Sequence, residues 1–343
     1  MIMNDNDFEL HVFITHFVPP RVTLFDTLAD IVSPRFSIEY LRSWARLLKH
    51  GTRGFQPWKK DILTNPRKKA QKERESKLAE VIRAVELIQA NSVNIYIYTN
   101  SDLQISGTSK NSNIRVIRNS HFNKMNTQNN SPWTEDFENS PWNLLWEHKK
   151  DLKLLAQQKS RRKGIFLVLE NDVLFTQQNL NYWLKNRETL RHAGLVPSFL
   201  RIEYSQNLGD WICIDIHGMN SLKECIVRKI ADSLVLQIPS LYSGLIVLDD
   251  ELLVEYVESK AIDKSQSKEL IWWDLGARAS MGIQFVNVPQ YFSDRHVIPL
   301  CQQSNLEIPK EALVHHLPNL YSSVPELANR YPTLDRVNLQ LGT

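Results

Sequence analysis

A short acidic turn interrupts the most apolar stretch of this sequence. The segment GIFLVLENDVLF, residues 164–175, runs as a continuous apolar strand into Glu170-Asn171-Asp172 and then becomes apolar again. Two carboxylates spaced two residues apart, with an amide between them, can hold a divalent cation through oxygen ligands. A solvated turn at the end of a strand would show the same pattern, so the triplet alone leaves both interpretations open.

Polar residues also stand at the ends of two other expected strands. His16 ends the first apolar run of the chain, Arg21 follows the double proline after it, and Thr99 and Asn100 end the second apolar run. In an open α/β sheet, ligands bind at the carboxyl ends of the strands. These four side chains are therefore candidates for a nucleotide pocket. For His16, a hydrogen-bonded packing role is an equally good interpretation.

A histidine pair near the end of the chain could complete a metal site. His315 and His316 stand in the segment VHHLPNLYS, outside any periodic pattern. Neutral imidazole is a common metal ligand. A histidine pair on the surface would show the same pattern, so the pair supports a metal site only together with the acidic turn.

A carboxylate next to two tryptophans could form part of a binding site for an acceptor molecule. Asp274 follows Trp272 and Trp273, and Glu269 lies shortly before them. A carboxylate there could act as a general base toward an acceptor hydroxyl, and tryptophan rings offer flat apolar faces to sugars. The alternative is a core helix with its tryptophans at an interface.

Several familiar catalytic and nucleotide-binding patterns are missing. The eleven glycines are roughly half the usual share and never form GxGxxG or GxxxxGK[ST], which argues against dinucleotide and P-loop folds. There is also no GxSxG, HExxH or protein-kinase motif set. A phosphate group would have to be held by side chains or by a metal.

Composition indicates one large globular domain. The chain has 343 residues, of which 42% are hydrophobic and 23% charged, and a net charge of +3. Three cysteines (Cys213, Cys225 and Cys301) form no CxxC spacing, and no apolar run reaches membrane length, so we expect a cytoplasmic protein. The basic stretch over residues 59–77 leaves a peripheral membrane contact open, whereas its interleaved glutamates argue against nucleic acid.

Strands alternate with helices along the chain, which predicts an α/β fold with a mostly parallel sheet. The expected strands are residues 10–17, 93–98, 114–117, 164–169, 198–204 and 243–248, and the expected helices are 38–48, 78–85, 142–158, 177–192, 268–281 and one beginning at 251. A hairpin is expected around Gly209, and the tail from Pro289 onward is expected to be loop.

Several of these segments resemble GT-A glycosyltransferases. FLVLENDVLF and the following NLNYWLKNRETLRHAGLVPSFLRIEY resemble the metal-binding region, in which a DxD-like motif closes a central strand. ELHVFITHFVPPR and IYIYTN resemble the nucleotide-binding half, and VHHLPNLYS resembles the C-terminal histidine segment. The resemblance implies a single GT-A-like, Rossmann-like domain with a mixed, mostly parallel central sheet flanked by helices. Residues 1–175 would bind the nucleotide sugar, and residues 176–343 would bind the acceptor.

The resemblance also implies roles for individual residues. Asp172 would bind the metal, Glu170 would contact the metal or the donor ribose, and His315 or His316 would complete the metal shell. The nucleoside pocket and diphosphate contacts would come from His16, Arg21, Thr99, Asn100 and Lys149 or Lys150. The implied cofactors are Mn²⁺ or Mg²⁺ and a nucleotide-sugar donor, UDP- or GDP-linked. The implied acceptor is a hydroxyl-bearing glycan or a lipid-linked molecule.

The chain departs from the family pattern at two points. Asn171 stands where an acid is common, which lowers the expected metal affinity, and the acceptor-base motif of inverting enzymes is not evident, so Asp274 is assigned by position alone. Two other functions stay open. One is a metal-dependent nucleotidyltransferase or phosphohydrolase that uses the same acidic turn, and the other is a non-catalytic binding protein of the same fold.

Overall fold

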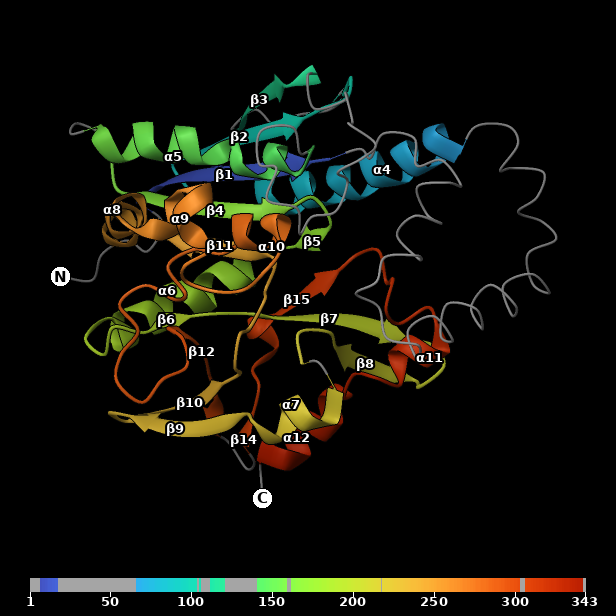
Figure 1. Ribbon diagram of the computed structural model, residues 1–343, viewed down its shortest axis with the longest axis vertical. Coiled ribbons are helices and arrows are strands. Elements are labelled where there is room, and N and C mark those ends of the chain that lie inside the picture. Colours follow the sequence, from blue (N-terminus) through green and yellow to red (C-terminus); the bar gives the residue numbers. More distant parts are fainter. Residues whose placement is uncertain are drawn as a thin grey trace.

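The computed structural model describes residues 7–17, 66–103, 105, 112–120, 141–158, 162–216, 218–302 and 306–341. Within these ranges the architecture is mixed α/β, with 35% helix and 29% strand. Figure 1 shows a five-stranded sheet with its helices in the upper half of the view and smaller sheets below it. Arg21, the helix expected over 38–48 and the beginning of the basic stretch lie outside the described residues.

The five-stranded sheet has the order β11-β4-β1-β2-β3. Its strands are β1 (Glu9–His16), β2 (Ser92–Thr99), β3 (Ser112–Arg118), β4 (Gly164–Glu170) and β11 (Leu245–Leu248). All neighbours are parallel except β11, which runs antiparallel to β4. Strands β1 and β4 are almost entirely buried, which explains why they read as continuous apolar runs rather than alternating ones. The prediction of a mostly parallel sheet is confirmed.

Helices connect these strands and pack against the sheet. Helix α4 (Pro66–Glu86) precedes β2, and both α4 and α5 (His148–Gln157) contact β1. Helix α8 (Asp250–Glu258) contacts β4, β11 and α5. The remaining helical segments are η2 (Pro141–Trp146), α6 (Gln177–Arg191), α7 (Gly218–Lys223), η3 (Lys260–Ile262), α9 (Lys264–Ser267), α10 (Leu275–Ala279), η4 (Lys310–Ala312), α11 (Pro325–Ala328) and α12 (Leu334–Leu341).

Smaller sheets form the second half of the molecule. One contains β5 (Val173–Leu174), β15 (Leu313–His316), β7 (Leu200–Ser205) and β8 (Asp210–Cys213) in that order, and another contains β6 (Val196–Pro197), β12 (His296–Pro299), β10 (Ser233–Gln237) and β9 (Ile226–Ile230). Strands β13 (Cys301–Gln302) and β14 (Leu306–Glu307) pair with each other. A continuous apolar core includes residues of both halves, such as Phe13, Trp183 and Ile298. None of the helices in the described ranges is long and apolar enough to cross a membrane.

Two expectations about the C-terminal third were wrong. The tail from Pro289 is not loop throughout, because β12, β15 and α12 lie in it. The expected helix over 268–281 is reduced to α10, which begins only after Asp274, whose carboxylate accepts a hydrogen bond from the Ala277 N–H at 2.7 Å. Apart from α12, these elements have only four or five residues, and such short elements leave little local pattern in the sequence.

A matched pair of leucine substitutions tests this packing. Leu167 lies in the middle of β4 and is fully buried, whereas Leu154 on α5 is exposed. We expect Leu167→Ala to lower the free energy of unfolding by about 2–5 kcal/mol, because it removes a core side chain and leaves a cavity. Leu154→Ala should change it by no more than about 0.5 kcal/mol. Urea-induced unfolding measures both; equal losses in the two variants would contradict the placement of β4 in the core.

Candidate functional site

The polar strand ends meet at the carboxyl edge of the central sheet. The register places His16 beside Thr99, and Thr15 beside Glu170, so the ends of β1, β2 and β4 lie side by side. Asn171, directly after β4, reaches across to β1, and its Nδ2 lies 3.0 Å from the Nδ1 atom of His16. The polar ends of these three strands therefore lie at one edge of the sheet.

His16 is held as a neutral ring at this edge. Its side chain is fully buried, and burial, reinforced by the positive charge of Arg74, lowers its pKa from 6.5 to about 4. Because the amide nitrogen of Asn171 donates to Nδ1, the ring proton sits on Nε2. Within the described residues this buried Nε2 has no hydrogen-bond partner, so its N–H is an unsatisfied donor.

Thr99 and Asn100 are also buried at this edge. The Thr99 hydroxyl is engaged within its own turn, where it lies 3.1 Å from the Ser101 hydroxyl and accepts a hydrogen bond from the Ser101 N–H at 3.1 Å. Thr99 therefore shapes the turn after β2. Its predicted contact with a nucleoside stays a prediction, as does that of Asn100.

The acidic turn is paired with His316 from the far end of the chain. Strand β15 runs antiparallel to β5 and places His316 opposite Val173, next to the turn. The Nε2 atom of His316 lies 3.9 Å from the Oδ2 atom of Asp172. That separation is too long for a hydrogen bond. It is short enough for one cation to touch both atoms at metal–ligand distances of about 2.1 Å.

Glu203 on β7 orients this histidine. The Nδ1 atom of His316 lies 2.6 Å from the Oε1 atom of the fully buried Glu203. The other carboxylate oxygen accepts hydrogen bonds from the backbone N–H groups of Tyr321 and Ser322 at 2.8 and 2.7 Å. Burial alone would raise the pKa of Glu203, but these hydrogen bonds outweigh it and lower the pKa. A carboxylate that accepts from Nδ1–H leaves Nε2 free to bind a metal, which is the usual support of a ligating histidine.

Of the two histidines that were alternative candidates for the metal shell, His316 lies beside the acidic turn, whereas His315 lies on the other face of β15. Successive side chains of a strand point to opposite faces. The ring of His315 packs edge-to-face against Trp211, with ring centres 5.2 Å apart, and its Nε2 lies 3.2 Å from the Asn319 side-chain oxygen.

Glu170 is held by protein side chains. Its Oε1 atom accepts hydrogen bonds from Tyr242 and, at 3.3 Å, from Ser280, and its Oε2 atom lies 3.5 Å from a guanidinium nitrogen of Arg201. Burial raises the pKa of Glu170, opposed by Arg201 and reinforced by the negative charge of Asp172. Its predicted contact with a metal or ribose stays a prediction, and in this structure its oxygens are engaged.

Arg201 and Gly244 complete the wall around Glu170. Arg201 binds Asp215 through Nε at 3.0 Å and Nη2 at 2.8 Å, and the two carboxylates outweigh the effect of burial and raise its pKa. Gly244 has a φ of +65°, and a Cβ atom there would lie 2.8 Å from Oε2 of Glu170. Any other residue at this position would have a strained backbone and would crowd this carboxylate.

The structure does not bring the predicted lysines to the acidic turn. Lys149 faces inward from α5, where its ammonium donates to the Ala261 carbonyl at 2.9 Å and lies 3.6 Å from the centre of a Trp146 ring. Burial, together with the positive charge of Arg278, lowers its pKa well below the ordinary value. Lys150 is exposed and pairs with Glu147 at 2.9 Å. Among the described residues, neither has a contact with Glu170-Asn171-Asp172, because the helical period of α5 turns one inward and the other to solvent.

Asp274 lies one short helix away from the site. It caps the start of α10, and Ser280, at the end of α10, contacts Glu170. Five helical residues separate the two ends, roughly 8 Å along the axis. The proposed role of Asp274 as a base stays a prediction, since its observed contact is that of a helix cap.

Arg201 and Glu203 were not among the predicted site residues, although their pattern in the sequence points to them. Both stand in the apolar strand LRIEYS, two residues apart, and therefore on one face of it. Charged residues at such spacing within a buried strand must find partners, because an unpaired buried charge is very costly. The partners themselves, Asp215 and His316, could not be read from the spacing.

The chemistry of the donor set suits a divalent cation with additional ligands. Asp172 offers a carboxylate oxygen and His316 a supported imidazole nitrogen, a pair compatible with Mn²⁺ and other divalent ions. The described residues hold no cluster of three or more potential ligands, so substrate oxygens or water would complete the shell. A protein-family scan finds no family model that matches this chain, and a search of the curated proteins finds no match either.

The burial of His16 predicts a pH-dependent stability. Its pKa of about 4 in the folded protein lies below the unfolded value of 6.5, so the unfolded chain binds a proton first as the pH falls. This contribution is fully present above about pH 6.5 and is lost toward pH 4, by about 3 kcal/mol at most. In His16→Asn, the fall in unfolding free energy between pH 7 and pH 4 should therefore be smaller than in the wild type. Chemical unfolding at several pH values measures it, and identical pH slopes would contradict a buried neutral His16.

Proposed function

We propose that this protein is a metal-dependent glycosyltransferase that moves a sugar from a nucleotide-sugar donor to a hydroxyl acceptor. The observation that carries the proposal is the pairing of Asp172 with His316, backed by the buried Glu203, at the carboxyl edge of a mostly parallel sheet. The mixed, mostly parallel character of this sheet, with the antiparallel strand β11, supports the fold that the resemblance to GT-A enzymes implies.

The metal would be held by Asp172 and His316. A bound Mn²⁺ or Mg²⁺ stabilises the negative charge that develops on a nucleoside diphosphate leaving group. Glu203 keeps the proton of His316 on Nδ1 and so presents the Nε2 lone pair to the cation. This route needs no glycine-rich phosphate loop, in agreement with the glycine-poor sequence.

The nucleoside would lie against the ends of β1 and β2. His16 offers its Nε2–H donor there, and Asn171 fixes the ring by its contact with Nδ1. The neutral ring suits a base or ribose oxygen better than a phosphate, because it carries no charge at neutral pH. Thr99 and Asn100 would complete this wall.

The acceptor would approach from the side of Trp273 and α10. The ring of Trp273 packs against Tyr242, which in turn contacts Glu170. Asp274 is the candidate general base, a role that typically contributes about 10²- to 10⁴-fold to the rate. The donor and acceptor sugars themselves are left open.

Divalent-ion binding tests the metal pair, with a matched control on the same strand. His316→Ala and Asp172→Ala should each abolish Mn²⁺-dependent binding of UDP or GDP, because each removes one of the two protein ligands. Glu203→Gln should weaken it about 10- to 100-fold, since His316 loses its oriented partner. His315→Ala should bind as the wild type does, because His315 lies on the opposite face of β15. Isothermal titration with and without Mn²⁺ measures all four.

Either of two results would refute this metal site. The first is wild-type binding in His316→Ala or Asp172→Ala. The second is an equal loss in His315→Ala. Circular dichroism and the thermal midpoint of each variant check that it remains folded.

Transfer itself is tested with a panel of UDP- and GDP-sugars in the presence of Mn²⁺. We expect slow donor hydrolysis, which transfers the sugar to water, and this activity should be lost on addition of EDTA and in Asp172→Ala. Cleavage at the α-phosphate with release of nucleoside monophosphate would instead favour a nucleotidyltransferase or phosphohydrolase. Failure of every nucleotide to bind with metal would refute the proposed function and favour a non-catalytic binding protein.

A further inference from the structure

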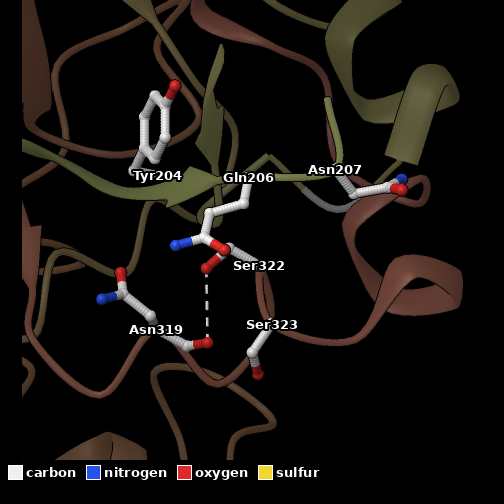
Figure 2. A pocket seen from close by; sticks show the side chains of 6 residues that line it. All are labelled: Tyr204, Gln206, Asn207, Asn319, Ser322 and Ser323. Carbon is white, nitrogen blue, oxygen red and sulfur yellow. Dashed lines mark hydrogen bonds between the residues drawn. The ribbon is translucent and has the colours of Figure 1, made fainter. Parts of the chain in front are cut away.

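A hollow lies beside the β7–β8 hairpin. It has a volume of about 580 Å³ and is partly open to solvent. Figure 2 shows the described residues that line it, namely Tyr204, Gln206, Asn207, Asn319, Ser322 and Ser323. The first three come from the end of β7 and the turn after it, and the others come from the segment that follows β15.

The six described side chains that line it are polar and uncharged. It carries three carboxamides and two serine hydroxyls, each of which can both donate and accept hydrogen bonds. None of the six side chains offers a cation for a phosphate, and only the Tyr204 ring offers a broad apolar face. This combination fits a ligand with many neutral hydroxyl groups and small apolar faces, which is the chemistry of an uncharged sugar.

Tyr204 offers an aromatic face at the rim of the hollow, and in the view of Figure 2 its ring points away from Gln206 and Asn319. Its side chain is 43% exposed, and its ring packs edge-to-face against Trp211 with centres 5.4 Å apart. Trp211 is in turn packed against His315. The aromatic face is thus fixed before a ligand arrives, which lowers the entropy lost on binding.

The opposite wall is fixed as well. Asn319 has a φ of +50°, and its carbonyl accepts hydrogen bonds from the Ser323 N–H at 3.0 Å and from the Ser322 hydroxyl at 3.3 Å. The Ser322 N–H is bound to the buried Glu203 at 2.7 Å. The segment that lines the hollow is therefore the same one that holds the carboxylate behind His316.

We propose that this hollow, the Tyr204 pocket, binds a neutral, hydroxyl-rich ligand such as part of a glycan chain. The pocket is distinct from the metal pair, because neither Asp172 nor His316 is among the described residues that line it. Tyr204 stacks on the sugar ring, and Gln206, Asn207 and Asn319 bind its hydroxyls. Binding requires neither cation nor nucleotide, so the inference goes beyond the proposed transfer activity.

The probes are neutral gluco-, manno-, galacto- and N-acetylglucosamine oligosaccharides, assayed in EDTA by saturation-transfer NMR and calorimetry. We expect at least one of them to bind. Tyr204→Ala should weaken that binding about tenfold or more. Gln206→Ala should weaken it about three- to tenfold, as expected for the loss of one or two hydrogen bonds. Leu208→Ala is the matched control, since Leu208 is exposed in the same turn but does not line the pocket, and it should bind as the wild type does.

Sugar binding in the Tyr204 pocket can be distinguished from the proposed transferase activity by the results of these assays. If no oligosaccharide binds, or if Tyr204→Ala and Gln206→Ala bind as tightly as Leu208→Ala, the inference is overturned. Binding that is lost in Asp172→Ala would assign the sugar to the metal pair and would overturn it too. Oligosaccharide binding in a protein that binds no nucleotide with metal would support the Tyr204 pocket and refute the transferase.

Discussion

The candidate site depends on the burial of one carboxylate. Glu203 is completely shielded from water, and a charge in that position is tolerated only when it is paired and hydrogen-bonded. His316 and the backbone of Tyr321 and Ser322 meet that requirement. Strand β15 and the segment after it are therefore held at a defined place beside β7, and the Nε2 atom of His316 is presented to Asp172.

A second buried network lies on the same face of β7. Arg201 stands two residues before Glu203, binds Asp215 closely and reaches Glu170 at the end of β4. Such networks stabilise little by themselves, because removing the charges from water offsets much of their attraction. Their consequence is geometric: the second sheet is bound to the carboxyl edge of the first, where a ligand of the central sheet would lie.

The elements that could be predicted were those with a long local pattern. The buried strands β1, β2 and β4 and the helix α6 were evident because their apolar residues follow one another or repeat at helical spacing. The strands β9, β10, β12 and β15 were not predicted; each has only four or five residues, as does β11, which was predicted. Segments of that length are stabilised by pairing with distant strands, and pairing leaves little trace in a local window.

The sequence by itself determined that an acidic turn would close a buried strand next to His16, because continuous apolar runs build parallel strands whose carboxyl ends share one edge. Only the tertiary structure decided which histidine joins that turn, and that Lys149 points away into the core. The reason is physical. Glu203 and His316 stand 113 residues apart, and their contact exists only once β7 and β15 are paired. The same pairing directs His315 to the opposite face, toward Trp211.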